Sequence, residues 1–114
     1  MSASVYPDPS PKMAQKRREA APEAEAAFQA FSKAVFAEGA LSPKMKQIIA
    51  VAVAHVTQCP YCIKGHTKAA LRHGASEQEL VEAIWVAAEM RAGGAFAHSL
   101  VALEEIERTA PRDD

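Results

Sequence analysis

Residues 42–66 read SPKMKQIIAVAVAHVTQCPYCIKGH, and this stretch decides the fold. Ser42 is a good N-cap, and Pro43 suits the first position of a helix. The run from Ile48 to Ala54 is apolar nearly all round, as in a helix that lies in a core or an interface. A short buried strand is the competing interpretation, but the capped start and the total length favour a helix that runs to about Gln58.

Helical signals continue on both sides of this stretch. Cys59 is expected to leave the first helix and cap the next, because Pro60 pushes the residue before it out of the α region. Ser76 and Glu79 form a capping box for a later helix, and Gly93-Gly94 is expected to break the pattern or allow close packing. The predicted helices cover about 22–37, 43–58, 60–73, 77–91 and 95–108, with a short one over 11–20.

No window alternates apolar and polar residues as a half-buried strand would. The sequence therefore predicts an all-α fold, a single compact domain of five or six helices. Residues 1–20 are interpreted as an N-terminal arm and residues 21–114 as the helical domain. In the helix over 22–37, the expected apolar face consists of Ala24, Ala27, Phe28, Phe31 and Val35.

The composition excludes several classes of protein. The chain has 114 residues, of which 49% are hydrophobic and 24% charged, which fits one globular domain. The formal net charge of −1 provides no basic excess for nucleic acid. No apolar run approaches the roughly 20 residues that span a bilayer, and no basic start precedes an apolar segment. We therefore expect a cytoplasmic protein without a signal peptide, membrane or nucleic acid partner.

Chemistry is concentrated in one segment, because the only two cysteines are Cys59 and Cys62. A thiol at a helix N-terminus, as expected for Cys59, is favoured as a thiolate. Cys62 is close enough along the chain to form a disulfide with it, and His66 shares a helical face with Cys62. These parts suit a thiol peroxidase, in which one thiolate becomes a sulfenic acid, the other condenses with it, and an external dithiol reduces the disulfide.

Two other interpretations of this segment remain open. The cysteines can be buried and inert, or His55, Cys59, Cys62 and His66 can supply four zinc ligands of the right chemical type. A helical arrangement would place His55 and His66 on two different helices, which weighs against zinc. We predict that the protein uses no metal and no organic cofactor.

The segment from Ile48 to Ser99 resembles the alkylhydroperoxidase D-like branch of the carboxymuconolactone decarboxylase family. The resemblance rests on Cys59-Pro-Tyr-Cys62-Ile-Lys-Gly-His66-Thr, on the helix before it, and on the downstream segments 71–80 and 91–98. It implies an all-helical subunit that assembles into a homotrimer or homohexamer, and reduction of hydroperoxides. It also implies that Cys62 forms the sulfenic acid and that Cys59 resolves it, whereas the helix N-terminus alone would have indicated Cys59 as the nucleophile.

One residue departs from the family pattern. Gln47 stands where the family places a glutamate that joins the histidine in a proton relay. An amide can orient water or an imidazole, but it cannot take up a proton at neutral pH. His55, Glu82 or Glu89 could substitute for the carboxylate. Tyr61, between the cysteines, is expected to line the substrate entrance.

The leading hypothesis is a thiol-dependent peroxidase that acts through Cys62, Cys59 and His66. Gln47, His55 and Tyr61 are its proton-relay or site-lining residues, and a hydroperoxide and a thiol or dithiol reductant are its partners. The alternatives are a lactone enzyme of the carboxymuconolactone decarboxylase type, whose branch does not depend on Cys-x-x-Cys, and a non-catalytic redox or zinc-binding oligomeric module.

Overall fold

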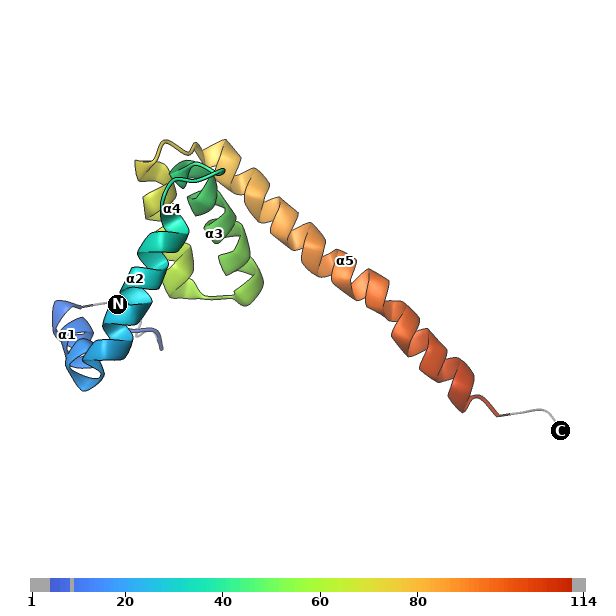
Figure 1. Cartoon of the computed structure of the whole chain (residues 1–114). Helices are drawn as coiled ribbons and strands as arrows, with labels where there is room; N and C mark the ends of the chain where they lie inside the picture. The colour runs from blue at the N-terminus through green and yellow to red at the C-terminus, as the bar shows by residue number, and fades with distance from the viewer. Residues whose placement is uncertain (1–4, 9, 112–114) are drawn as a thin grey trace.

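The computed structural model describes residues 5–8 and 10–111. Within these residues the chain forms five α-helices and no strand, so the all-α prediction is confirmed. In chain order the helices are α1 (Pro11–Ala20), α2 (Pro22–Phe36), α3 (Pro43–Thr57), α4 (Pro60–Arg72) and α5 (Glu77–Thr109) (Figure 1).

The predicted division near Gly93-Gly94 is wrong, because α5 continues through both glycines to Thr109. Each glycine in a helix costs about 1 kcal/mol relative to alanine, which lowers stability without ending a helix. No proline lies within α5, so no backbone N–H of its hydrogen-bond ladder is missing. A helix of 33 residues results, about 50 Å long at 1.5 Å per residue.

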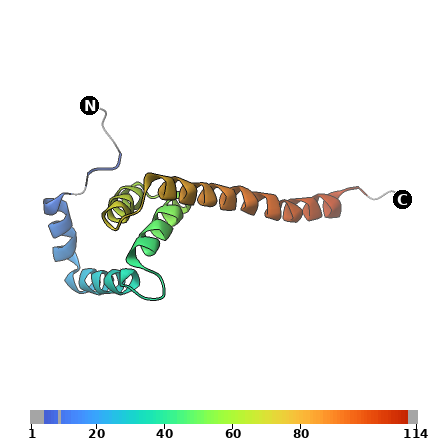
Figure 2. The same cartoon turned by 90° about the horizontal axis from the view of Figure 1, so that it is seen from above.

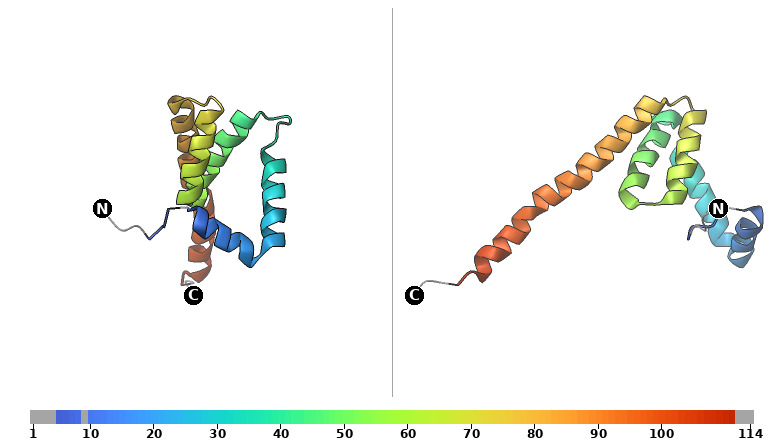
Figure 3. Two further views of the ribbon diagram at one scale, coloured as in Figure 1. Left: turned by 90° about the vertical axis from the view of Figure 1, so that its left-hand side faces the viewer. Right: turned by 180° about the vertical axis from the view of Figure 1, so that it is seen from behind.

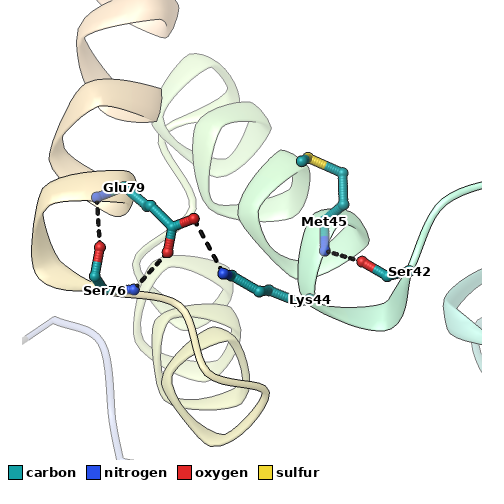
Figure 4. Close-up of polar contacts among 5 residues, drawn as sticks. All are labelled: Ser42, Lys44, Met45, Ser76 and Glu79. Atoms are coloured by element: carbon teal, nitrogen blue, oxygen red, sulfur yellow. Dashed lines mark hydrogen bonds and ion pairs between the residues drawn. The ribbon is translucent and has the colours of Figure 1, made fainter.

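Local capping rules fix where α3 and α5 begin, and Figure 4 shows both caps. The Met45 N–H donates to the Ser42 hydroxyl at 3.1 Å. In the capping box, the Glu79 N–H donates to the Ser76 hydroxyl at 3.0 Å and the Ser76 N–H donates to the Glu79 carboxylate at 2.8 Å. Lys44 lies 3.1 Å from that carboxylate, so a single acid joins the first turns of α3 and α5.

The core lies where α3 packs against α4 and the first half of α5 (Figure 1). Its buried residues are Ile48 and Val51 of α3, Ala70 of α4, Ala75 and Leu80. The alanines let the helices approach closely, and Val51 is the only large side chain of the described residues that is completely buried. A core this small closes only one end of the molecule.

The remaining N-terminal helices lie beside this core and are less firmly packed. Figures 2 and 3 show α1 and α2 meeting at a sharp bend, with α2 returning to the start of α3 through an irregular loop. The Lys46 ammonium joins the two helices, because it donates to the carbonyls of Val35 at 2.8 Å and Ala37 at 2.5 Å. This contact holds the C-terminal end of α2 next to α3.

The single chain is not compact, contrary to expectation. Its radius of gyration is 20.5 Å and its extents are 69 × 37 × 36 Å, whereas a compact chain of this length has a radius of about 13 Å. The distal half of α5 projects alone from the other helices (Figures 1 and 2) and exposes Phe96 and Leu100 by 82% and 70%. In the described part of the chain, no helix combines the length and apolar character needed to cross a membrane.

Candidate active site

The turn between α3 and α4 places the first cysteine. Gln58 adopts the left-handed conformation, with φ of 61°, and its N–H donates to the Ala54 carbonyl at 2.9 Å, which ends α3. Cys59 is extended and is the N-cap of α4, where its Sγ accepts the Cys62 N–H at 3.3 Å. A cysteine sulfur therefore replaces the serine or aspartate oxygen that caps most helices, as the Pro60 position predicts.

The two thiols form a hydrogen-bonded pair, with their Sγ atoms 2.9 Å apart. The hydrogen bond from the Cys62 thiol, supported by the backbone N–H groups of Cys62 and Tyr61, lowers the pKa of Cys59. The same hydrogen bond raises the pKa of Cys62, and burial and the charge of Cys59 act in the same direction. Since only Cys59 accepts a backbone N–H among the two, the first negative charge of the pair resides there.

His66 is held by a residue from another helix. Its Nδ1 lies 2.7 Å from Oε1 of Gln47, a side chain that is 9% exposed. An amide oxygen only accepts, so this contact assigns the proton to Nδ1 and leaves the lone pair on Nε2. Phe36 of α2 stacks on the imidazole, with ring centroids 5.1 Å apart and planes 23° apart. Together the two contacts fix both the tautomer and the plane of the ring.

A cavity of about 490 Å³ lies over this histidine. Three residues near the end of α2 line it, together with Gln47 of α3 and the face of α4 that carries Cys62 and His66. Cys59 is not among the lining residues that the structure describes. A substrate in this cavity, named here the thiol pocket, would meet Cys62 and the imidazole before it met Cys59.

The other residues considered from the sequence lie apart from this arrangement. His55 directs Nδ1 to the Val51 carbonyl of its own helix, at 2.7 Å. In residues 5–8 and 10–111, no three side chains of histidine, cysteine or acid type gather closely enough to hold a metal ion, so the four hypothetical zinc ligands do not converge here. Within the same residues, His66 donates a hydrogen bond to Gln47 and forms none with Glu82 or Glu89.

Two contacts of the site were not predicted from the sequence. Phe36 was not among the expected apolar face of its helix, yet it is the ring that stacks on His66, while Phe28 and Phe31 of that face are 61% and 64% exposed. Tyr61 lines the thiol pocket and also donates its hydroxyl to the Pro7 carbonyl at 2.9 Å. The only sequence signal for the stacking on His66 was the apolar side chain of Phe36 at the end of α2. Nothing in the sequence indicated the contact between Tyr61 and Pro7.

Comparison with known proteins places the chain in a family. The sequence model of the carboxymuconolactone decarboxylase family matches residues 22–105. A protein of Paracoccus denitrificans, called uncharacterized protein 4 in the cox locus, is 63% identical in an alignment of 84 positions that covers 71% of this chain and 76% of the relative.

Solved structures agree. A protein from Methanobacterium thermoautotrophicum superposes with a TM-score of 0.70 at 38% identity, over 74% of this chain and 94% of the other. A Thermotoga maritima carboxymuconolactone decarboxylase family protein, for which an involvement in the antioxidative response has been suggested, gives a TM-score of 0.53 at 26% identity, over 71% and 93%. With its residues 22–105 matched and its helical fold shared with these structures, the chain belongs to the carboxymuconolactone decarboxylase family.

Proposed function

We propose that this protein is a thiol-dependent peroxidase that reduces organic hydroperoxides through Cys62 and Cys59. The observation that carries the proposal is that the two thiols occupy different positions relative to the thiol pocket. Cys62 and His66 line one cavity, while the Cys59 sulfur, whose pKa is lowered by the hydrogen bond from Cys62, lies 2.9 Å from the Cys62 sulfur. Cys62 can therefore contact the substrate, and Cys59 lies close enough to form the disulfide with it afterwards.

The reaction balances with these groups alone. Starting from two thiols, Nε2 of His66 takes the proton of Cys62, and the Cys62 thiolate attacks the terminal oxygen of ROOH, so that the O–O bond breaks and an S–O bond forms. The leaving alkoxide takes that proton back from the imidazolium and departs as ROH. Cys59 then attacks the Cys62 sulfenic acid and forms the disulfide, and its thiol proton leaves with the displaced hydroxyl group as water. Two thiols are oxidised and one hydroperoxide is reduced.

Gln47 and His66 serve this reaction as a positioning residue and a proton carrier. Because the Nδ1 proton is held by the Gln47 oxygen at 2.7 Å, Nε2 is the ring nitrogen that can accept a proton from Cys62 and pass it to the leaving alkoxide. A neutral amide fixes the ring without adding charge. The family glutamate is therefore replaced in its orienting role, and proton uptake falls to the imidazole.

The relatives and the chemistry support the same activity and its setting. The suggested antioxidative involvement of the Thermotoga maritima relative agrees with hydroperoxide reduction. Regeneration requires an external thiol or dithiol, and reductants of this kind keep thiols reduced in the cytosol. We accordingly place the protein in the cytoplasm, with a dithiol protein or small thiol as its reductant.

Self-association is part of the proposal. Large apolar side chains along α5 are exposed in the single chain, among them Trp85 at 70%, Phe96 at 82% and Ile106 at 62%. A projecting helix with such a surface is typical of a subunit whose partner covers it. We propose that copies of this chain associate through α5, as a homotrimer or homohexamer.

Steady-state turnover tests the activity. Wild-type protein with excess dithiothreitol and cumene hydroperoxide is expected to consume many equivalents of hydroperoxide per subunit. Cys59→Ser is the matched control, since it retains Cys62 and the thiol pocket but cannot form the internal disulfide, and its rate should fall by at least about tenfold. Equal rates for wild type and Cys62→Ser would contradict the proposal and direct attention to lactone substrates.

A further inference from the structure

A second cavity of about 440 Å³ adjoins the thiol pocket on the other side of Tyr61. Its walls combine rings and cations: the rings belong to Tyr6, Pro7, Pro60 and Tyr61, and the ammonium groups to Lys64 and Lys68. We name this cavity the arm pocket, because residues 6–8 of the N-terminal segment form one wall and the start of α4 forms the other.

Tyr61 holds the arm pocket together. Its hydroxyl donates to the Pro7 carbonyl at 2.9 Å across 54 residues of sequence. Its ring also meets the Tyr6 ring edge to face, with centroids 6.0 Å apart and an interplanar angle of 81°. Tyr61, one of the two residues between the cysteines, thus holds the N-terminal segment against the start of α4.

The two cavities share the surface of α4. Residues three and four apart lie along one face of a helix, so Cys62, His66 and Ala69 face the thiol pocket, Lys64 and Lys68 face the arm pocket, and Tyr61 at the start of the helix lines both. Gly65 lies between these rows and lines both cavities, and a Cβ placed there would meet no atom within 4 Å. Open space therefore runs over Gly65 from one cavity to the other.

The charges of the arm pocket favour an anion. Within the described residues neither Lys64 nor Lys68 forms an ion pair, and the two lie one turn apart on α4. Asp8 is the one acidic residue in the lining, so the lining carries a net positive charge. Rings beside unpaired cations suit a ligand with an apolar body and one anionic end.

From this juxtaposition we propose that the arm pocket binds the carboxylate of an amphipathic ligand. Together with the proposed function, on which this consequence rests, it makes acidic organic hydroperoxides the preferred substrates. The carboxylate lies at Lys64 and Lys68, the apolar body passes over Gly65, and the peroxide group lies in the thiol pocket at Cys62. Neutral hydroperoxides occupy only the thiol pocket, and their binding is not strengthened by the two lysines.

Direct binding tests the arm pocket without any peroxide chemistry. Octanoate is titrated into the reduced full-length protein by calorimetry, with octanol as the uncharged counterpart. We expect octanoate to bind, octanol to bind at least about tenfold more weakly, and the difference to shrink at high salt. The double variant Lys64→Gln/Lys68→Gln should weaken octanoate binding about tenfold or more.

The chain offers a matched control for that double variant. Lys12 and Lys16 also lie one turn apart on an exposed helix, α1, and line neither cavity. Lys12→Gln/Lys16→Gln removes the same total charge and should leave octanoate binding unchanged. Asp8→Asn provides a test of opposite sign, since removal of the single acid should tighten binding about twofold to threefold.

Substrate preference completes the test. A carboxylate-bearing hydroperoxide should oxidise the wild-type dithiol at least about tenfold faster than its methyl ester, and the ratio should fall to about one in Lys64→Gln/Lys68→Gln. Octanoate binding that the Lys12/Lys16 and Lys64/Lys68 double variants reduce equally, or not at all, overturns the proposal. Lysine-dependent octanoate binding without reduction of any hydroperoxide upholds the carboxylate site and overturns the peroxidase function instead.

Discussion

The α3–α4 pair and the distal half of α5 are equally helical and similarly apolar, but they differ in what covers them. Val51 of α3 is fully buried by α4 and α5, whereas Phe96 and Leu100 of α5 are 82% and 70% exposed. The first region closes upon itself and carries the thiols. The second extends from it with no neighbouring helix in the single chain (Figure 1).

The contrast shows that the two regions have different tasks. Packing between α3 and α4 supports the turn at Cys59 and the contact between Gln47 and His66. The distal half of α5 does not pack against the other helices of its own chain (Figure 1), so its apolar residues are available to another copy. Chemistry should therefore fail when α4 is altered, and assembly should fail when α5 is altered.

The largest effect is expected at Cys62. Replacement by serine removes the nucleophile and should lower hydroperoxide reduction by about 10³-fold or more. The sedimentation coefficient should remain that of the wild type, because Cys62 belongs to α4 and not to the exposed distal half of α5. A change in subunit assembly on this substitution would break the proposed separation of the two regions.

The second effect concerns association. Phe96→Glu/Leu100→Glu places two carboxylates on the distal face of α5. If each side chain loses about 1.5–3 kcal/mol of burial, self-association should weaken by more than about a hundredfold. Sedimentation at micromolar concentration should then show monomers. Monomers already present in the wild type would show that this surface has another use.

Two valine substitutions on α3 compare the free energy of unfolding at a buried and at an exposed position of the α3–α4 pair. Val51→Ala should lower the free energy of unfolding by about 2 kcal/mol, since it leaves a cavity at a fully buried position. Val53→Ala, at a position that is 51% exposed in the single chain, should change it by less than about 0.5 kcal/mol. Urea unfolding gives both values. A large loss at Val53 would place that side chain inside the assembly interface.

The smallest effect is expected in the pH dependence of thiol alkylation. Cys62 lowers the pKa of Cys59 by donating a hydrogen bond to its thiolate, so Cys62→Ala should move that pKa upward. Since the thiolate is the reactive form, alkylation of Cys59 by iodoacetamide at neutral pH should slow several-fold, and its pH profile should shift to higher pH. The converse variant, Cys59→Ala, should shift the Cys62 profile to lower pH. Unshifted profiles would show that the thiols act independently.

Local rules in the sequence predicted the parts of the fold that depend on a few adjacent residues. Ser42-Pro43 and the Ser76–Glu79 capping box begin helices as expected, because the cap is made within four residues of chain. The same local reasoning failed at Gly93-Gly94, where the ladder of α5 on both sides tolerates two glycines. The prediction of a compact shape was also wrong, because the distal part of α5 has no partner in its own chain.

The site was predictable only in part, for a similar reason. The sequence places Cys59, Cys62 and His66 on one helix, and the family resemblance directs attention to Gln47. The stacking of Phe36 on His66 depends on where α2 docks, which Lys46 fixes through the carbonyls of Val35 and Ala37. The bond from Tyr61 to Pro7 joins residues 54 positions apart. The spacing of residues along the sequence predicts neither the Phe36–His66 contact nor the Tyr61–Pro7 contact.

Mass spectrometry can identify directly which of the two sulfur atoms the hydroperoxide attacks. Reduced protein is mixed with one equivalent of cumene hydroperoxide, and intact mass and peptide mapping follow. We expect the wild type to lose two hydrogens through a Cys59–Cys62 disulfide, and Cys59→Ser to gain one oxygen at Cys62. Rapid oxygen gain at Cys59 in Cys62→Ser, with Cys59→Ser unreactive, would contradict the assigned roles, and unchanged thiols in the wild type would contradict the peroxidase itself.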